Sequence, residues 1–234
     1  MTVAIRCRGI KKTYGNDENK VEALKSTDLD INFGQLTLIV GPSGSGKTTL
    51  ISIIATILTP DEGELILLDR QMNGLSGNEK ALFRCKHIGF VFQSLFLIPS
   101  LSIVENVALP LIVAGMHEKL AIVKAMEMLE KVHLAHRANE PPTKLSKGQQ
   151  QRVAIVRAMI NDAEIIICDE PTSSLDHTSG FEIMEFLHTL AKNSTKAVVV
   201  VTHDPRIFSY ADHIIPMSDG ELTMQEAVHE QKLL

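Results

Sequence analysis

Gly41-Pro42-Ser43-Gly44-Ser45-Gly46-Lys47-Thr48-Thr49 is the stretch of sequence that decides the fold of this chain. It follows the apolar run 36–40 and leads into the apolar run 50–54, so the pattern predicts a strand, a glycine-rich loop and a helix. The loop fits the pattern G-x-x-x-x-G-K-[ST]. Glycines at these positions let the backbone curl until successive N–H groups point inward, where they can surround phosphate oxygens.

Two side chains of this loop have a further task in binding a nucleoside triphosphate. Lys47 brings a positive charge to the β- and γ-phosphates, and Thr48 offers its hydroxyl to a Mg²⁺ ion whose other ligands are mostly water and phosphate. The N-terminus of the following helix adds its dipole and its unpaired N–H groups. The alternative is a glycine turn with a lysine beside it, but the strand–loop–helix context favours the nucleotide site. The residues expected to contact the nucleotide are Gly41, Pro42, Ser43, Gly44, Ser45, Gly46, Lys47, Thr48 and Thr49.

The composition is that of a globular protein with one large domain or two small ones, because 234 residues, 44% of them hydrophobic, can bury a sizeable core. The net charge of −5 disfavours non-specific binding to nucleic acid, which needs a basic surface. The sequence has no run of about 20 apolar residues, and its N-terminus lacks the apolar core of a signal peptide. Cys7, Cys85 and Cys168 match no metal-binding spacing and are expected to be small core residues. We therefore expect a cytoplasmic protein.

Strand and helix patterns alternate along most of the chain. Continuous apolar strands that alternate with helices predict an α/β fold with a mostly parallel sheet covered on both faces. Residues 94–142 have helical patterning instead, and the stripe Ile122, Met126 and Leu129 is expected to face the core. Strands are expected at 3–14, 29–33, 36–40, 64–68, 88–92, 164–168, 197–201, 213–217 and 221–224, with a polar turn at 16–20. Helices are expected after the phosphate loop and at 77–86, 119–132, 146–160 and 179–192.

Polar residues follow three of the predicted strands, namely Gln93, the pair Asp169-Glu170, and His203. Ligands of open α/β sheets bind beyond the carboxyl ends of the strands, so these residues are expected to lie beside the phosphate loop. Asp169 is placed to hold the Mg²⁺ shell, and Glu170 to orient or deprotonate the attacking water. Gln93 could sense the metal or the water, and His203 could donate to the γ-phosphate. Each alone could be a helix cap or a structural group, but four polar signals at one sheet edge favour a catalytic site.

Two further positions allow two interpretations each. Ser146-Lys147-Gly148-Gln149 fits the S-x-x-Q capping box, in which Ser146 and Gln149 satisfy each other's backbone donors at a helix start. A serine and a glycine at a helix start also form an anion site. Tyr14 precedes a polar turn, where an aromatic ring either packs locally or stacks on an adenine base.

Leu145-Ser146-Lys147-Gly148-Gln149-Gln150 resembles the signature sequence of ATP-binding-cassette (ABC) ATPases, which usually reads LSGGQ. The other motifs of that family stand in the expected order, so the resemblance covers essentially the whole chain. They are Tyr14 (A-loop), Gly41–Thr48 (Walker A), Gln93 (Q-loop), Ile165–Glu170 (Walker B), Ser174-Leu175-Asp176 (D-loop) and His203 (switch histidine).

The resemblance implies a P-loop NTPase fold and assigns roles to these residues. Its catalytic core would comprise 1–93 and 143–234 with an N-terminal antiparallel β portion, and 94–142 would be a helical subdomain that adjoins the signature helix 146–160. Catalytic roles fall to Lys47, Gln93, Glu170 and His203, and Mg²⁺ ligation to Thr48, Gln93 and Asp169. Nucleotide contacts outside Walker A fall to Tyr14, Ser146, Gly148, Gln149 and Asp176.

The family also implies a mechanism with two facing ATPase chains. Each ATP would lie between Walker A of one chain and the signature helix of the other, where Ser146 and Gly148 would grip the γ-phosphate. Binding would close the dimer, which is expected to be a homodimer, and hydrolysis at Glu170 would release it. The segment 94–142, with Gln93 as its hinge, would carry the motion to a separate membrane permease on whose cytoplasmic face the chain would sit.

Several shorter stretches are similar to the ATPases of lipoprotein-release and macrolide-exporter systems; they are 91–93, 101–107, 110–111, 149–154 and 217–220. A mechanical signalling ATPase that moves no substrate would have almost the same sequence. A soluble ABC ATPase that acts on nucleic acid or ribosomes is disfavoured, because such proteins commonly carry two cassettes, long insertions or zinc motifs.

One departure from the family pattern is Lys147 in place of the first signature glycine. It would be strained if that position needs a positive φ, and we expect instead that it begins a regular helix.

Overall fold

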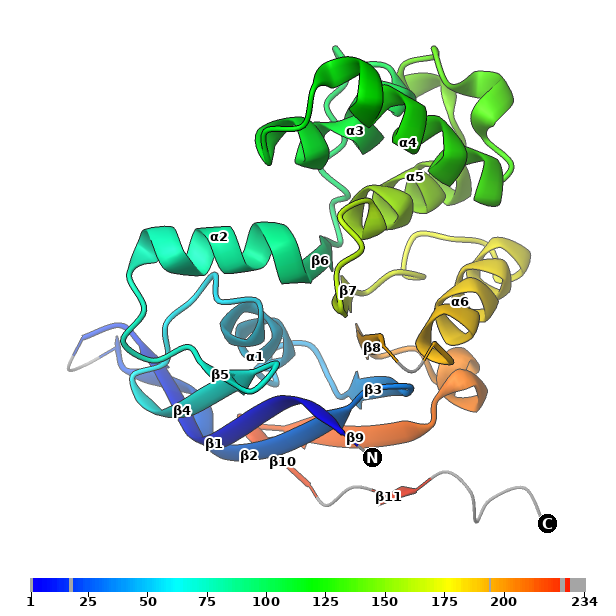
Figure 1. Ribbon diagram of the computed structural model, residues 1–234. Coiled ribbons are helices and arrows are strands. Elements are labelled where there is room, and N and C mark those ends of the chain that lie inside the picture. Colours follow the sequence, from blue (N-terminus) through cyan, green and yellow to red (C-terminus); the bar gives the residue numbers. More distant parts are fainter. Residues whose placement is uncertain (1, 17–18, 194, 224–225, 228–234) are drawn as a thin grey trace.

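Two β-sheets of different kinds form the framework of the fold (Figure 1). The computed structural model describes residues 2–16, 19–193, 195–223 and 226–227. The smaller sheet contains β1 (Val3–Tyr14), β2 (Val21–Asn32), β4 (Glu62–Leu67) and β5 (Arg70–Gln71). These strands lie in the order β2-β1-β4-β5 and every pair is antiparallel. The antiparallel β portion implied by the family resemblance is thus confirmed.

The larger sheet is mostly parallel, as the sequence predicts. It contains β3 (Leu36–Val40), β6 (Ile88–Val91), β7 (Ile165–Asp169), β8 (Ala197–Thr202), β9 (His213–Ser218), β10 (Glu221–Leu222) and β11 (Glu226–Ala227). The order is β10-β9-β3-β8-β7-β6; neighbours from β9 to β6 are parallel, whereas β10 and β11 pair with β9 in the antiparallel direction. Every residue of β3, β7 and β8 is buried, which explains their almost unbroken apolar sequences.

Helices cover both faces of the larger sheet, because successive side chains of each strand point to opposite sides. The helices are α1 (Lys47–Ile54) and α2 (Gly77–His87) on one face, and α5 (Lys147–Met159) and α6 (His177–Ala191) on the other (Figure 1). Ile167 of β7 belongs to the apolar cluster of α1, α2 and the antiparallel sheet. Its neighbour Ile166 belongs to the cluster of α5 and α6. The phosphate-loop helix α1 therefore lies between the two sheets.

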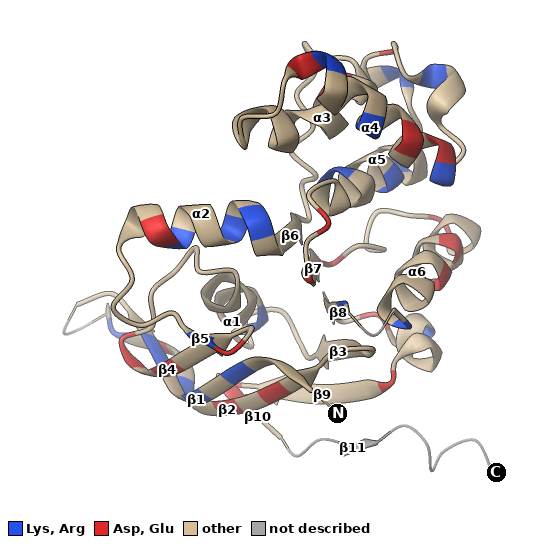
Figure 2. Ribbon diagram, viewed as in Figure 1, with Lys and Arg blue, Asp and Glu red and all other residues tan. Residues whose placement is uncertain are grey.

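A third apolar cluster is built mainly by α3 (Ile103–Val113), α4 (Glu118–Lys131) and α5, with 3-10 turns at Ala135–Arg137 and Pro142–Lys144. Figure 1 shows α3 and α4 away from both sheets, with α5 between them and the rest of the molecule. Lys and Glu are interspersed along α4, whereas α2 has one Glu near its start and only basic charged residues after it (Figure 2). Within the described part of the chain, no helix has the length and apolar character needed to cross a membrane.

The buried seam of α4 differs from the predicted stripe. Its fully buried residues are Ala121, Ala125 and Leu129, whereas Ile122 and Met126 are half-buried beside the same cluster. Small residues at the centre of a helix contact allow a short distance between the axes, and larger side chains then fill its margins. All three predicted residues thus face the core, as expected, and Ala121 and Ala125 are buried more deeply than Ile122 and Met126.

Several strand boundaries also differ from those expected. β2 begins at Val21 instead of 29, because its polar first half pairs with β1 through Tyr14↔Val21 and Thr13↔Glu22. In β6 only Gly89 and Val91 are fully buried, so the prediction of a buried strand is half right. β10 ends at Leu222, and residues 17, 18 and 224 of the predicted turn and strand lie outside the described residues. The two-residue strands β5 and β11 are too short to leave a periodic pattern.

Two of the cysteines are buried, as expected of small core residues. Burial raises the pKa of the Cys7 thiol and of the Cys168 thiol to about 12 in each case, so both stay protonated and unreactive near neutral pH. Cys85 on α2 is half-buried, so the expectation holds fully only for the other two.

Gly89 of β6 offers a test of how tightly α5 is seated on the sheet. A Cβ atom at this position would lie 2.2 Å from the carbonyl oxygen of Ala158 and 2.8 Å from Cδ1 of Ile166. Gly89→Ala must therefore displace α5 and is expected to lower the free energy of unfolding by about 1–3 kcal/mol in urea titrations. The control is Gly77→Ala at the start of α2, where nothing lies within 4 Å. Equal stability of the two variants would contradict this packing.

Candidate active site

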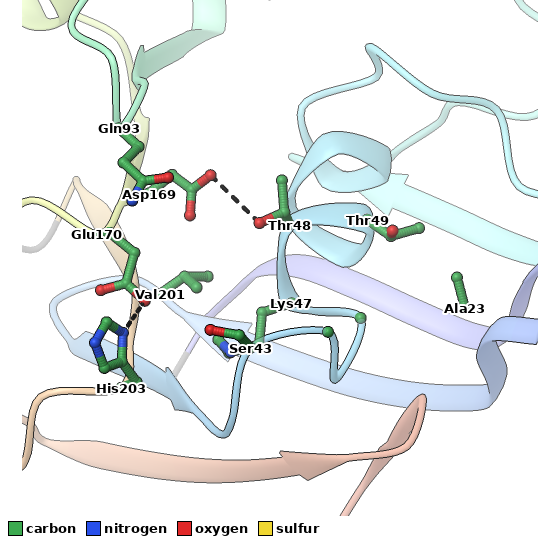
Figure 3. A pocket seen from close by; sticks show the side chains of 12 residues that line it. Ala23, Ser43, Lys47, Thr48, Thr49, Gln93, Asp169, Glu170, Val201 and His203 are labelled. Atoms are coloured by element: carbon green, nitrogen blue, oxygen red, sulfur yellow. Dashed lines mark hydrogen bonds and ion pairs between the residues drawn. The ribbon is translucent and has the colours of Figure 1, made fainter.

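The ends of four parallel strands meet at one pocket. In the register of the sheet, Val40 of β3 pairs with Thr202 of β8, and Asp169 of β7 pairs with Val201. Because β6 is paired with β7 and parallel to it, all four strands end at the same edge of the sheet. The pocket at this edge has a volume of about 290 Å³ (Figure 3). It is lined by Ala23, Ser43, Gly44, Gly46, Lys47, Thr48, Thr49, Gln93, Asp169, Glu170, Val201 and His203.

The phosphate loop depends on glycine at two positions. Gly44 and Gly46 have φ values of 82° and 100°, in the left-handed region that other residues disfavour. Gly46 is also the N-cap of α1 and provides no side-chain cap, so backbone N–H groups of the first turn stay available to a ligand. A Cβ at Gly46 would lie 2.3 Å from the carbonyl oxygen of Ala23. The close contact between Gly46 and the backbone of β2 in the antiparallel sheet therefore fixes the position of the loop.

Lys47 lies inside the loop and is almost fully buried. Its Nζ donates to the carbonyl oxygens of Gly41 and Pro42, at 2.7 Å each, and to Oγ of Ser45 at 3.3 Å. Burial lowers the pKa of Lys47, and the negative charges of Glu170 and Asp169 oppose that shift. The ammonium group is thus held by acceptors that anionic phosphate oxygens can replace.

Asp169 and Thr48 face each other across the pocket. Thr48 Oγ1 donates to Asp169 Oδ2 at 3.4 Å (Figure 3). Asp169 is the last residue of β7, whereas the sequence suggested the first residue after the strand, and it is buried. Burial, and then the neighbouring carboxylate of Glu170, raise the pKa of Asp169.

These two residues and Gln93 fit a magnesium ion. In the part of the chain that the structure describes, no group of three or more His, Cys, Asp and Glu could hold a metal by itself. Mg²⁺ does not need such a group, since it binds through one or two carboxylates and completes its shell with substrate phosphates and water. One hydroxyl and one carboxylate lie within hydrogen-bond distance, and the Gln93 amide lines the same pocket. This donor set matches the ion expected from the sequence.

Glu170 lies in a strained backbone conformation beside His203. Its φ is 50°, which a non-glycine residue rarely adopts, and its N–H donates to the carbonyl oxygen of Val201 at 2.9 Å. Its Oε1 lies 2.6 Å from Nδ1 of His203, and its side chain is only 11% exposed. Its Oε2 is buried and has no hydrogen-bond partner among the described residues. One carboxylate oxygen is thus oriented by the histidine, and the other is buried without a partner among the described residues.

The signature stretch does not reach this pocket. Ser146 is the N-cap of α5; its Oγ accepts from Gln149 N–H at 3.3 Å, and its own N–H donates to Gln149 Oε1 at 3.0 Å. The capping box is therefore confirmed, and Arg137 donates to the same Gln149 oxygen at 3.0 Å. Lys147 occupies the first helical position and has no positive φ, so it begins a regular helix as expected. Neither Ser146, Gly148 nor Gln149 lines the pocket of its own chain.

Asp176 lies next to the signature stretch and also caps a helix. Its Oδ1 accepts from Ser179 N–H at 3.0 Å and its Oδ2 from Ser179 Oγ at 2.8 Å; these bonds lower the pKa of Asp176. A Cβ at Gly148 would lie 3.0 Å from Ser179 Oγ, so the N-termini of α5 and α6 lie side by side. Tyr14 does not line the pocket; it is 42% exposed, and Lys12 Nζ lies 5.9 Å from the centre of its ring.

Two lining residues, Ala23 and Val201, had no signal in the sequence. Ala23 meets the loop through its backbone, in a half of β2 that the sequence did not predict to be a strand. Val201 is one of many apolar residues in β8, and only its place at the end of the strand brings it to the pocket.

Comparisons with known proteins agree with this geometry. A family model described as ABC transporter matches residues 24–173. The lipoprotein-releasing system ATP-binding protein LolD of Pseudoalteromonas translucida is 40% identical over 97% of this chain and 98% of its own length. The macrolide export ATP-binding/permease protein MacB of Pasteurella multocida is 42% identical over 96% of this chain, which spans only 34% of that relative. A solved dimeric ATP-binding cassette of Methanocaldococcus jannaschii, bound to ADP and Pi after hydrolysis, has a TM-score of 0.88 at 41% identity and covers 95% of this chain and 98% of its own.

Asp169 allows a test of the electrostatic cost of the site. The pKa of Asp169 in the folded chain is raised above the ordinary 3.8. As pH rises, the carboxyl of Asp169 therefore ionises in the unfolded chain before it ionises in the folded chain. The free energy of unfolding falls over this pH range, until Asp169 of the folded chain is ionised too. Asp169→Asn removes the effect and should make the nucleotide-free chain more stable at pH 7 by about 1 kcal/mol. Urea titrations from pH 3.5 to pH 7 would measure the difference, which should vanish at the acidic end.

Asp61→Asn is a control in which the change in the free energy of unfolding is expected to have the opposite sign. The Lys12 side chain and the Thr13 N–H donate to Asp61 and hold the pKa of its carboxyl below the ordinary value, so this carboxylate contributes stability that is lost as pH falls. The control variant should therefore be less stable than the parent chain at pH 7. Loss of stability in both variants would contradict the assignment for Asp169.

Proposed function

The chain belongs to the ABC transporter family, and from this premise we propose that it drives a separate membrane permease of the lipoprotein-release or macrolide-export type. It is an ATP-hydrolysing cassette that uses ATP with Mg²⁺. The observation that carries the proposal is the pocket where the phosphate loop, the Thr48–Asp169 contact and the Glu170–His203 pair converge. Each part has a separate task in phosphoryl transfer to water.

The phosphate loop binds and neutralises the triphosphate. Lys47 exchanges the carbonyl oxygens of Gly41 and Pro42 for oxygens of the β- and γ-phosphates, and the first N–H groups of α1 add further donors. Thr48, Asp169 and Gln93 would hold the Mg²⁺ ion, which would supply additional positive charge to the phosphates. Tyr14, at the end of β1, is the candidate for stacking on the adenine. The remaining contacts to the phosphates come from Ser43, Gly44, Ser45, Gly46 and Thr49.

Glu170 acts as the general base. The attacking water bonds to the γ-phosphorus and gives a proton to Glu170, while the bond from that phosphorus to the β,γ-bridging oxygen breaks and ADP leaves. His203 orients Glu170 through Oε1 and donates to the γ-phosphate. Glu170 is preorganised as a base, so it contributes to catalysis through its position beside the attacking water. The backbone of Glu170, with φ 50°, holds the side chain in that position.

A second chain completes the site. Ser146, Gly148, Gln149 and Asp176 lie together at the starts of α5 and α6, outside the pocket of their own chain. In a head-to-tail homodimer Ser146 and Gly148 reach the γ-phosphate bound to the facing chain, and Gln149 and Asp176 contact the same nucleotide, as the dimeric relative with ADP and Pi supports. Residues 94–142 then act as a helical subdomain that moves on the core 1–93 and 143–234, with Gln93 as the hinge. The permease would hold the dimer at the cytoplasmic face of the membrane.

Glu170→Gln tests the catalytic assignment. An amide of the same shape cannot take the proton, so turnover should fall by about 10²–10⁴-fold while ATP binding is retained. Phosphate release and binding of a fluorescent ATP analogue would measure the two quantities separately. The control is Glu164→Gln, since Glu164 also contacts a histidine, His87, at 3.1 Å but precedes β7 instead of following it. Undiminished hydrolysis in the first variant would remove Glu170 from the catalytic role.

Affinity purification from detergent-solubilised membranes tests the coupling to a permease. The tagged chain should carry with it a membrane protein with few spans and a large extracytoplasmic domain, and the tag alone should not. Recovery only from the soluble fraction, with ribosomes, nucleic acid or nothing bound, would overturn the transporter assignment and leave the ATPase in place. A captured membrane protein that signals and moves no substrate would replace transport with mechanical signalling.

A further inference from the structure

In the described part of the chain, three helices begin with the same capping box, and the box of α5 differs from the other two. Ser76 of α2 and Ser102 of α3 each donate their hydroxyl proton to the glutamate that closes the box, at 2.8 Å and 2.6 Å. In α5 the box is closed by Gln149, whose Oε1 accepts from the Ser146 N–H and from Arg137. Within the residues that the structure describes, the Ser146 hydroxyl accepts from the Gln149 N–H, and its own proton has no acceptor.

Lys147 adds an unpaired cation beside that hydroxyl. It is the first residue of α5, its side chain is exposed, and it takes part in no ion pair or side-chain hydrogen bond within the described residues. The acids around this helix start are engaged elsewhere. Glu140 pairs with Arg137 at 2.7 Å. Asp176 accepts from Ser179 at the start of α6. No described residue of this chain therefore neutralises the ammonium group of Lys147.

The charge of Lys147 is unfavourable for the helix that it begins. The N-terminus of a helix carries a partial positive charge, so acids stabilise the first turn and a lysine destabilises it. The first turns of α2 and α3 contain Glu79 and Glu105, whereas the first turn of α5 contains no acid. Departures from such local rules are expected at functional sites. A hydroxyl donor, an ammonium group and a helix dipole together favour an anion at the start of α5.

We propose that Lys147 is a further ligand of the γ-phosphate that is bound to the facing chain. This inference rests on the proposed function, because it requires the start of α5 to lie against the nucleotide of a second subunit. A lysine binds phosphate as a point charge on a flexible four-carbon stem, so it needs no fixed geometry at the interface. Its ammonium and the Ser146 hydroxyl then donate to the same phosphate. The glycine that the family pattern has at this position offers no side-chain charge or donor.

The same ammonium makes closure of the dimer depend on the charge of the nucleotide. The facing pocket contains Lys47 and the N-terminus of α1, which are both positive. Without nucleotide these groups repel Lys147. When ATP is bound, the negative charges of its phosphates lie between the two lysines and attract both of them. Lys147 thus opposes closure on an empty pocket and favours closure on a triphosphate.

Lys147→Gln tests this inference in a chain that also carries Glu170→Gln, so that bound ATP is not hydrolysed. Glutamine has nearly the same helix propensity as lysine and leaves the capping box in place, so only the charge is removed. The dissociation constant of the ATP-bound dimer, measured by analytical ultracentrifugation at about 50 mM salt, should rise about tenfold, because a charge-assisted hydrogen bond is lost at each site. The difference should shrink at about 500 mM salt, where ions screen the charges.

Two further variants separate a direct contact from the overall charge. Lys144→Gln removes the same charge from an exposed side chain three residues earlier, in the 3-10 turn before α5. It should leave the dissociation constant of the dimer within about twofold of the value measured with both lysines present. Lys147→Arg keeps the charge, so it should keep both the tight dimer and its dependence on salt. Binding of a fluorescent ATP analogue to the monomer should be unchanged in all variants, because neither lysine lines the pocket of its own chain.

The outcomes separate this inference from the proposed function. A dimer that is equally tight in Lys147→Gln at both salt concentrations, or equally weakened in Lys144→Gln, would overturn the role of Lys147 while the two-chain site stands. A dimer as weak in Lys147→Arg as in Lys147→Gln would also overturn it. If Lys147→Gln is not recovered folded, Lys147→Gly decides: the same loss supports the role of Lys147, and an unchanged dimer overturns it. A Glu170→Gln chain that forms no dimer with ATP would overturn the proposed two-chain site, and this inference with it.

Discussion

The parallel register of β3, β8, β7 and β6 is the constraint on which the site depends. Three of these strands are buried along their whole length, so charged side chains fit poorly anywhere but at their ends. Since the strands run in the same direction, those ends lie at one edge, and Lys47, Asp169, Glu170 and His203 gather there. The same burial that stabilises the sheet thus determines where its polar chemistry can be located.

The pocket concentrates features that lower stability. Asp169 is a buried carboxylate with a raised pKa, Lys47 is a buried ammonium with a lowered pKa, and Glu170 has a left-handed backbone. Each is unfavourable in the nucleotide-free chain, and a bound magnesium–nucleotide complex would satisfy the first two directly. The apolar clusters on both faces of the sheet offset these unfavourable contributions to the free energy of folding. The core thus supplies stability, and the pocket supplies function at the expense of stability.

Features with a local cause could be predicted from the sequence, and features with a distant cause could not. The phosphate loop, the capping box of Ser146 and the apolar strand before Asp169 each follow from neighbouring residues, and each was found near its predicted boundaries. The polar half of β2 is a strand only because β1 lies beside it, and α4 places small alanines at its centre only because α3 is close. The contact of Arg157 with the turn after Gln93 spans more than 60 residues and uses backbone acceptors, which carry no sequence signal.

The position of α5 limits how the helical part of the chain can move. Ala154 and Ile155 of α5 pack with the large sheet, whereas Val153 and Val156 pack with α3 and α4. This helix therefore contacts both the predicted core and the predicted helical subdomain, although all its residues follow the predicted boundary at 143. Near its C-terminal end, the backbone at Ala158 lies so close to Gly89 that no Cβ fits between them. A rotation of α5 about that contact would displace its N-terminal capping box more than its C-terminal turn.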